Sequence, residues 1–293
     1  MGSSATGMDW GGAPFVGFRR RGIGPPFEID PFYGKTVPMT QMICIANQKG
    51  GVGKTTTAIN LSAALALAGH PTLLVDCDPQ ANATTGVGIE KAGLERTLYH
   101  GLLGEAEAAE LLTPVPDVAT LSLIPSRVEL IGFEVEMMDA EGREQAMTQF
   151  LAPVVDRFDY ILMDCPPSLS LLTLNAMTAA DRVLIPLQCE FYALEGLGQL
   201  LQTLELVRGG LNPQLAVLGI LLTMYDGRTN LSQQVAEEAQ GYFSGRERVF
   251  ATVIPRNVRL GEAPSFGAPI VLYDPASAGA RAYQALAAEI LSG

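Results

Sequence analysis

The sequence of 293 residues predicts an α/β fold: a doubly wound, mostly parallel sheet with helices on both faces. Short apolar runs alternate with longer segments of helical periodicity, which is the order expected of parallel strands joined by crossover helices. Several of these runs are apolar throughout, as strands buried on both faces must be. A glycine-rich loop joins the first run to a long Ala- and Leu-rich stretch, and 48% hydrophobic content is enough for a core.

The expected elements follow in order along the chain. The first strand is expected at 42–46, the glycine-rich loop at 47–53, and the first helix at 54–68, ended by Gly69. Further strands are expected at 72–75, 121–124, 160–163, 183–186, 217–223 and 249–254. We see no internal repeat, so 41–293 is expected to form a single domain. Its ligand should lie at the carboxyl ends of the strands.

The loop at 47–57 reads Asn-Gln-Lys-Gly-Gly-Val-Gly-Lys-Thr-Thr-Thr. Its glycines let backbone N–H groups face a phosphate, Lys54 can reach the β- and γ-phosphates, and the Thr55 hydroxyl can take a Mg²⁺ ion at the helix N-terminus. The loop therefore predicts a nucleoside triphosphate site. The expected contacts are Lys49, Gly50, Gly51, Val52, Gly53, Lys54, Thr55 and Thr56.

The loop departs from the usual pattern G-x-x-x-x-G-K-[ST] because Gln48 stands where its first glycine belongs, and Lys49 follows at once. A second lysine at this place would point away from the phosphates held by its own loop. Its useful target is a nucleotide on a facing copy, which predicts a homodimer with nucleotide between the subunits and a catalytic role for Lys49. The alternative is a glycine-rich turn with two solvated lysines.

Other motifs lie at the ends of the expected strands. These are Asp-Cys-Asp-Pro-Gln-Ala-Asn at 76–82, Ile-Leu-Met-Asp-Cys-Pro-Pro-Ser at 161–168, and the segments 188–196, 221–230 and 253–260. Together with the glycine-rich loop, they resemble the ParA/MinD family of ATPases with a deviant Walker A P-loop, and most closely its chromosomal ParA/Soj branch. The resemblance runs from about residue 41 to the C-terminus. Ala81 departs from the glycine usual at its position, so loop mobility is expected to differ.

The resemblance implies roles for the acidic residues. Asp164 would hold Mg²⁺ through water together with Thr55. Asp76 would hold in place the groups that surround the metal. Asp78 would position the attacking water, or else it is a turn carboxylate that caps the following helix. Lys54 and Lys49 would neutralise phosphate charge, which is the main requirement of phosphoryl transfer.

Pro255 and Asn257 would frame the adenine, because an Asn amide offers a donor and an acceptor to a purine edge. The alternative is an ordinary Pro-Asn turn. No guanine-binding signature occurs in the later loops, so ATP is the expected nucleotide.

Proteins of the Soj type dimerise on ATP, bind double-stranded DNA without sequence preference, and release it when a ParB/Spo0J-like partner stimulates hydrolysis. The resemblance implies that Arg228, Arg256 and Arg259 contact DNA. The alternative is surface arginines paired with Asp226 or Glu262. A net charge of −12 argues against a surface that is basic throughout, but it permits a local patch.

Other uses of such an ATPase stay open. A MinD-like protein would act on a membrane, but the tail at 280–293 has no lysine and an Ala-rich face typical of a packed helix, so no membrane contact is expected. A related ATPase could instead position another protein assembly or regulate the replication initiator.

Cellular location follows from the termini and the cysteines. Residues 1–40 are Gly- and Pro-rich without periodicity, so a disordered or non-native extension is expected. No apolar segment follows the arginines at 19–21, so no signal peptide forms. Four cysteines without a C-x-x-C pair indicate buried, reduced thiols. We therefore expect a cytoplasmic protein, and the resemblance implies that it associates with the nucleoid.

Overall fold

The computed structural model describes residues 27–29, 36–38, 40–190 and 195–293. The chain divides into two units, Met1–Val37 and Pro38–Gly293. β1 (Phe27–Ile29) and β2 (Thr36–Pro38) pair as a two-stranded sheet. Apart from Thr40, the rest of the expected N-terminal extension lies outside the described residues, including the arginines at 19–21, and so do residues 191–194 of the motif at 188–196.

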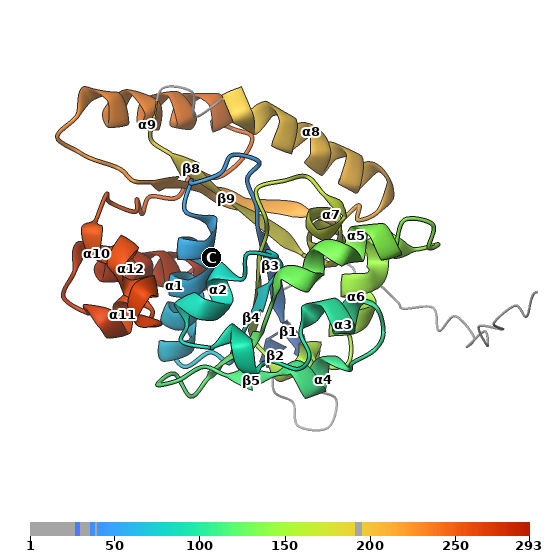
Figure 1. The fold of residues 1–293 in the computed structure, drawn as a ribbon. Coiled ribbons are helices and arrows are strands. Elements are labelled where there is room, and N and C mark those ends of the chain that lie inside the picture. Colours follow the sequence, from blue (N-terminus) through green and yellow to red (C-terminus); the bar gives the residue numbers. More distant parts are fainter. Residues whose placement is uncertain (1–26, 30–35, 39, 191–194) are drawn as a thin grey trace, which may run out of the picture. The chain divides into compact units, whose positions relative to one another are not determined.

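A seven-stranded sheet forms the centre of the second unit, in the order β5-β6-β4-β7-β3-β8-β9 (Figure 1). Its strands are β3 (Gln41–Ile45), β4 (Thr72–Asp76), β5 (Thr113–Pro114), β6 (Leu121–Ile124), β7 (Tyr160–Asp164), β8 (Arg182–Gln188) and β9 (Ala216–Thr223). All neighbours pair in parallel except the short edge strand β5, which is antiparallel to β6. The predicted fold class is confirmed.

Helices cover both faces of this sheet (Figure 1). On one side lie α1 (Lys54–Leu67), α2 (Asn82–Gly86), α10 (Val258–Glu262), α11 (Ile270–Tyr273) and α12 (Ala278–Leu291). The other helices are α3 (Leu98–Leu102), α4 (Ala108–Leu111), α5 (Gly132–Glu136), α6 (Ala146–Leu151), α7 (Leu171–Ala179), α8 (Glu195–Gly210) and α9 (Asn230–Phe243). The α1 helix ends where Gly69 adopts a φ of 97°, as the sequence predicted.

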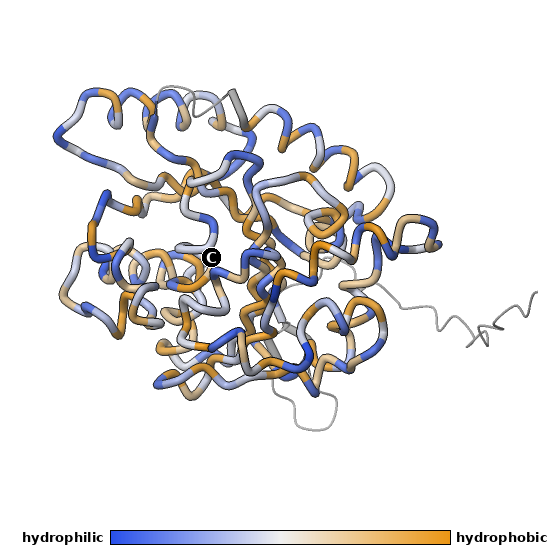
Figure 2. The backbone as a smooth tube through the Cα atoms, in the orientation of Figure 1, coloured by the Kyte–Doolittle hydropathy of each residue, from blue (hydrophilic) through white to orange (hydrophobic). Residues whose placement is uncertain are grey.

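Two hydrophobic cores lie on opposite faces of the sheet, because successive strand residues point in opposite directions. In β3, Ile43 and Ile45 belong to the core under α1 and α12, whereas Cys44 belongs to the other. The central strands are mostly apolar, whereas polar and apolar residues alternate along α8 and α9 (Figure 2). All four cysteines are buried and free, which confirms the expected thiols.

The C-terminal helix is part of the core, as expected for an Ala-rich packed helix. Tyr283 and Leu286 of α12 are fully buried, and the Tyr283 hydroxyl is 3.2 Å from the Thr57 hydroxyl of α1. No helix among the described residues is long and apolar enough to cross a membrane.

The prediction of a strand at 249–254 is wrong. The segment runs beside β9, where the Phe250 and Ile254 amides donate to β9 carbonyls, but it forms only one isolated bridge, between Val249 and Ile220. Between these contacts, the amides of Ala251 and Thr252 donate to the Glu289 carboxylate of α12, each at a distance of 2.9 Å. A side chain distant in sequence therefore takes the Thr252 amide, which is the donor between Phe250 and Ile254 that a regular ladder with β9 needs.

Candidate functional site

The loop between β3 and α1 has the backbone geometry of an anion cradle. Gly51 and Gly53 adopt φ angles of 76° and 89°, which side chains with a Cβ rarely tolerate. Gly53 is the N-cap of α1 and provides no side-chain cap, so the first N–H groups of the helix are available to a ligand. The predicted phosphate loop therefore lies at the positive end of a 14-residue helix.

The loop is held in place by the ends of neighbouring strands. The Asn47 amide donates to the Pro186 carbonyl of β8 over 2.7 Å, and the Thr223 hydroxyl of β9 donates to the Val52 carbonyl over 2.8 Å. These two contacts were not predicted, because the motifs at 47–57 and 221–230 do not show which side chain meets which backbone carbonyl in space. They fix the loop before any nucleotide binds.

The two lysines of the loop have different environments. Lys54 is buried, and its ammonium donates to the Lys49 carbonyl over 3.0 Å. Burial lowers the pKa of Lys54, while the nearby Asp164 carboxylate acts in the opposite direction. The Lys49 side chain is one-third exposed and pairs with Glu190, which follows β8. Glu190 is a partner that sequence reasoning missed.

Asp76 and Asp164 are neighbours, because β4 and β7 are paired with these two residues in register at their carboxyl ends. The Asp76 carboxylate accepts bonds from the Thr84 amide and hydroxyl, both over 2.7 Å, and from the Asp78 amide over 3.2 Å. Burial raises the pKa of Asp76 to about 6, although the bonds from Thr84 oppose this shift. Asp76 therefore anchors the loop that carries Asp78.

The carboxylate of Asp164 differs from that of Asp76. It is fully buried, and neither oxygen has a hydrogen-bond partner among the residues that the structure describes. Burial and the charge of Asp76 raise the pKa of Asp164, and Thr55 and Lys54 lower it. Buried polar groups without partners are rare, so these two oxygens are suited to bind a cation.

These residues fit a Mg²⁺ ion. Within the described part of the chain, no group of three His, Cys, Asp or Glu side chains forms a metal cage. Mg²⁺ bound beside a nucleotide needs no such cage, since it usually takes one or two protein oxygens along with phosphates and water. Asp164 and Thr55 offer such oxygens, whereas both oxygens of Asp76 already accept protein bonds.

Asp78 is buried and lies in the loop that follows β4. One of its oxygens accepts from the Gln80 amide over 2.9 Å, which is the turn contact of the alternative interpretation. The next residue, Ala81, has a φ of 55° and is fully buried, so a position that favours glycine carries a methyl group.

The loops that carry Pro255, Asn257 and the three arginines converge beyond β9. Tyr225 bridges Pro255, and its backbone exchanges bonds with Ile254 and Arg256, each over 3.0 Å. The Asn257 side-chain oxygen caps α10 through the Arg259 amide over 2.8 Å. Its amide nitrogen has no partner among the described residues, so it can still donate.

Ion pairs occupy two of the three arginines. Arg228 is 88% exposed, and its guanidinium contacts the Asp226 carboxylate with two bonds of 2.9 and 2.8 Å. Arg259 pairs with Glu262 over 2.8 Å and with Asp274 over 3.5 Å. Arg256 is exposed, and no ion pair of its guanidinium occurs among the described residues. The ion pairs of the alternative interpretation are therefore present at Arg228 and Arg259. Both arginines are also accessible to solvent, as contact with DNA would require.

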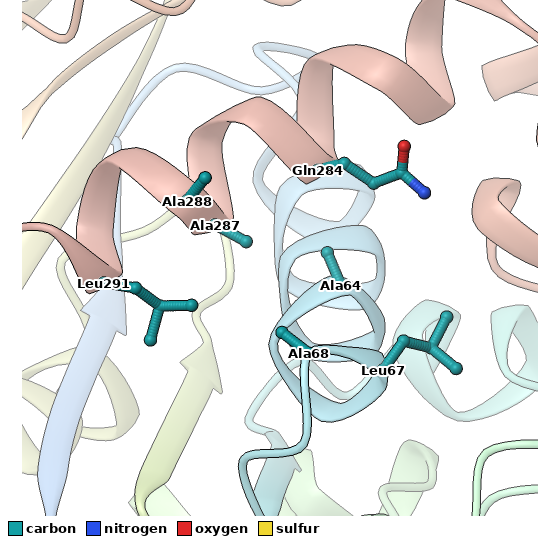
Figure 3. Close-up of a pocket in the computed structure, with 7 residues that line it drawn as sticks. All are labelled: Ala64, Leu67, Ala68, Gln284, Ala287, Ala288 and Leu291. Carbon is teal, nitrogen blue, oxygen red and sulfur yellow. The ribbon is translucent and has the colours of Figure 1, made fainter.

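A pocket of about 240 Å³ lies elsewhere, between α1 and α12 (Figure 3). Its lining is apolar except for one glutamine and consists of Ala64, Leu67, Ala68, Gln284, Ala287, Ala288 and Leu291. Leu67 ends α1, whereas the phosphate loop precedes the start of that helix. The pocket is therefore separate from the nucleotide site.

Comparison with known proteins agrees with this geometry. A family model described as an AAA domain matches residues 40–217. The chain is 54% identical over 251 residues to the chromosome partitioning protein ParA of Myxococcus xanthus, covering 86% of this chain and 88% of that protein. It is 54% identical over 252 residues to the sporulation initiation inhibitor protein Soj of Bacillus subtilis, covering 86% and 98%.

Among solved structures, the chain is similar to a cobyrinic acid a,c-diamide synthase of Mycobacterium smegmatis with bound ADP and magnesium. The TM-score is 0.76 at 38% identity, over 86% of this chain and 94% of that one. The resemblance seen in the motifs is thus confirmed over most of the length. This chain belongs to the ParA/Soj family of chromosome-partitioning ATPases.

Proposed function

We propose that this protein is a Mg²⁺-dependent ATPase that dimerises on ATP, binds DNA without sequence preference in that state, and releases it after hydrolysis stimulated by a ParB/Spo0J-like partner. The observation that carries the nucleotide chemistry is the Asp164 carboxylate, which is buried beside Lys54 and Thr55 at the start of α1 and whose two oxygens have no hydrogen-bond partner in the described part of the chain. A solved relative that binds ADP and magnesium supports the same assignment.

Each residue of the site has a role in this proposal. The loop amides and Lys54 bind the β- and γ-phosphates, and Pro255 and Asn257 frame the adenine. Thr55 and Asp164 hold Mg²⁺, which neutralises phosphate charge when bound. Asp78 positions the attacking water, and Asp76 keeps the Asp78 loop in place through its bonds to Thr84 and to the Asp78 amide.

Dimerisation depends on Lys49. Its side chain is partly exposed and pairs with Glu190 of the same subunit. We propose that it leaves this partner and contacts the nucleotide of a facing copy, where its charge stabilises the transition state. Exposed ion pairs contribute little free energy, so the exchange costs little.

DNA would contact the arginines beyond β9, beside the seam of such a dimer. Arg256 is exposed, while Arg228 and Arg259 would exchange their carboxylate partners for phosphate oxygens. Two copies double this patch, so affinity would depend on ATP. Since phosphate contacts release counterions, affinity would also fall steeply with salt. In the cell the protein would lie on the nucleoid.

Light scattering of the full chain tests the nucleotide part. With Mg²⁺ and ATP, the wild-type protein and the Asp78→Ala variant should double in mass, and only the wild type should turn over ATP at its normal rate. Lys49→Ala should bind ATP but stay monomeric, and Lys54→Ala should not bind it. A monomeric Asp78→Ala protein at saturating ATP would refute the dimer, and tight ATP binding by Lys54→Ala would refute the phosphate loop.

A further inference from the structure

An apolar stripe is exposed on the segment that joins β6 to α6. It consists of Val128, Ile131, Val135 and Met138, and these residues are 61, 56, 67 and 59% exposed. The first two belong to a 3₁₀ helix, Val128–Ile131, and the third to α5. Their spacing of three and four residues places the first three along one face of the helical segment, and Met138, in the turn that follows α5, continues the row. We call these four residues the α5 stripe.

The α5 stripe is separate from the face by which its own segment packs on the core. Leu130 and Phe133 of the same segment are fully buried and belong to the core that also contains Met147. The segment is therefore apolar on both faces, and only one of them has a partner within the described residues. Single exposed apolar side chains are ordinary, but a row of four large ones on one face indicates a binding surface.

Acidic residues surround the stripe. The segment 127–144 contains six acidic residues and two arginines. Both arginines are occupied, because Arg127 pairs with Glu129 over 2.7 Å and Arg143 with Glu144 over 3.1 Å. Four carboxylates have no ion-pair partner among the residues described, namely Glu134, Glu136, Asp139 and Glu141, and Glu136 accepts a hydrogen bond from the Tyr99 hydroxyl. The stripe therefore lies in a region of negative charge.

We propose that the α5 stripe and these carboxylates form the docking surface for a partner protein that presents a basic amphipathic helix. The stripe spans about 15 Å at helical rise, which matches about three turns of such a helix. Its apolar face would cover the stripe, and its lysines or arginines would face the unpaired carboxylates.

Charge decides between this occupant and others. A second copy docked by the same surface would place carboxylates opposite carboxylates, since a two-fold interface is self-complementary. DNA and anionic lipid surfaces would be repelled in the same way. The proposal depends on neither ATP nor DNA, so it stands or fails apart from the proposed function.

The surface is also tied to the nucleotide site. Two residues before Val128, the Ser126 amide donates to the Thr84 hydroxyl over 3.0 Å, and that hydroxyl donates to the Asp76 carboxylate. A helix docked on the stripe would therefore contact a segment that is joined through one side chain to the loop of Asp76.

Three fluorescent peptides of about 18 residues serve as probes for the nucleotide-free full chain. One is a helix with leucines on one face and lysines on the other, the second has the same composition in a scrambled order, and the third has glutamates in place of the lysines. Fluorescence anisotropy should give binding of the first peptide at least about tenfold tighter than of the other two. Equal affinity for the ordered and scrambled peptides would overturn the proposal.

Matched variants locate the site. Ile131→Ser with Val135→Ser, and separately Glu134→Gln with Asp139→Asn, should each weaken the first peptide by about tenfold or more. The controls are Leu206→Ser, an apolar residue of α8 that is 76% exposed, and Glu237→Gln with Glu238→Gln on α9. All of these side chains except Glu134 are exposed, so unfolding, checked by circular dichroism, is not expected.

Two further results would contradict the proposal. One is an equal loss of affinity in the control variants, which would show general attraction to an acidic protein. The other is a change in the mass of the chain alone when Ile131 and Val135 are replaced, which would identify a second copy as the occupant. A benzophenone on the first peptide should cross-link to segment 127–144, and cross-links confined to other segments would also refute it.

Discussion

Replacing Asp164 by Asn should stabilise the nucleotide-free protein. The carboxylate is fully buried at the end of β7, and neither oxygen has a hydrogen-bond partner within the described structure. Burial and the neighbouring Asp76 raise its pKa, so the charged form is unfavourable. An amide has nearly the same shape and carries no charge, and therefore removes most of this cost.

The size of the effect follows from the cost of a buried polar group without a partner, which is about 1–3 kcal/mol. The Asn amide also lacks partners and keeps part of this cost, so the gain in unfolding free energy should be positive but no larger than about 1–3 kcal/mol. For a domain of this size, each kcal/mol raises the melting temperature by about 2–4 °C. Urea unfolding at neutral pH measures the gain, and Asp156→Asn, an exposed carboxylate, is the control with a change within about 0.5 kcal/mol.

The same variant should lose the stabilisation that Mg²⁺ adds to nucleotide. A ligand at one hundred times its Kd stabilises a protein by about 2.7 kcal/mol. For the wild type, ADP with Mg²⁺ should stabilise more than ADP with a chelator, whereas Asp164→Asn should show no such difference. An Asn variant less stable than the wild type without nucleotide, or one with an unchanged Mg²⁺ effect, would refute the assignment of Asp164.

Three other predictions concern single residues. Asp226→Asn frees Arg228 from its ion pair, so DNA should bind about twofold to fivefold tighter in gel shifts; no gain, or a gain that survives in the double variant with Arg228→Ala, would contradict this. Ala81→Gly relieves a φ of 55°, which costs about 1–2 kcal/mol, but it removes a buried methyl group worth about 0.8 kcal/mol, so the unfolding free energy should rise by at most about 1 kcal/mol; a less stable variant in urea would show that the methyl group contributes more than the strain costs. Burial raises the pKa of Asp76 from 3.8 to about 6, so the folded state binds this proton more tightly and the contribution to stability falls as pH rises from about 4 to about 6. The difference between wild type and Asp76→Asn should show that slope, and a parallel pH profile would refute it.

The sequence predicted most of the central sheet and the phosphate loop because these depend on local patterns. Strands β4, β6, β7, β8 and β9 lie at the predicted places within two residues at each end, since each is a short apolar run between turns. The first helix and its end at Gly69 follow from glycine's freedom at positive φ. The failure at 249–254 has the opposite cause, because the decisive contact comes from Glu289, about forty residues further along the chain.

The residues of the candidate site also fall into two groups, those that local sequence patterns reveal and those that only spatial contacts reveal. Residues that bind by type and spacing, such as Lys54 and Asp164, are visible in motifs. Glu190 and Thr84 are not, because their roles depend on which side chain they meet in space: Lys49 for one and Asp76 for the other. The α5 stripe was missed for a related reason, since an apolar residue in a helical pattern is normally assigned to the core.

Sedimentation with unrelated DNA duplexes tests the central claim most directly, that ATP makes this protein a DNA clamp. The Asp78→Ala variant should be used, because slow hydrolysis preserves the ATP state, with Asp78→Ala plus Arg228→Ala as the matched control. We expect binding with ATP but not with ADP, equal for all duplexes, weaker at higher salt, and lost in the control. An Asp78→Ala protein that dimerises on ATP but does not bind DNA at low salt would contradict the proposed function.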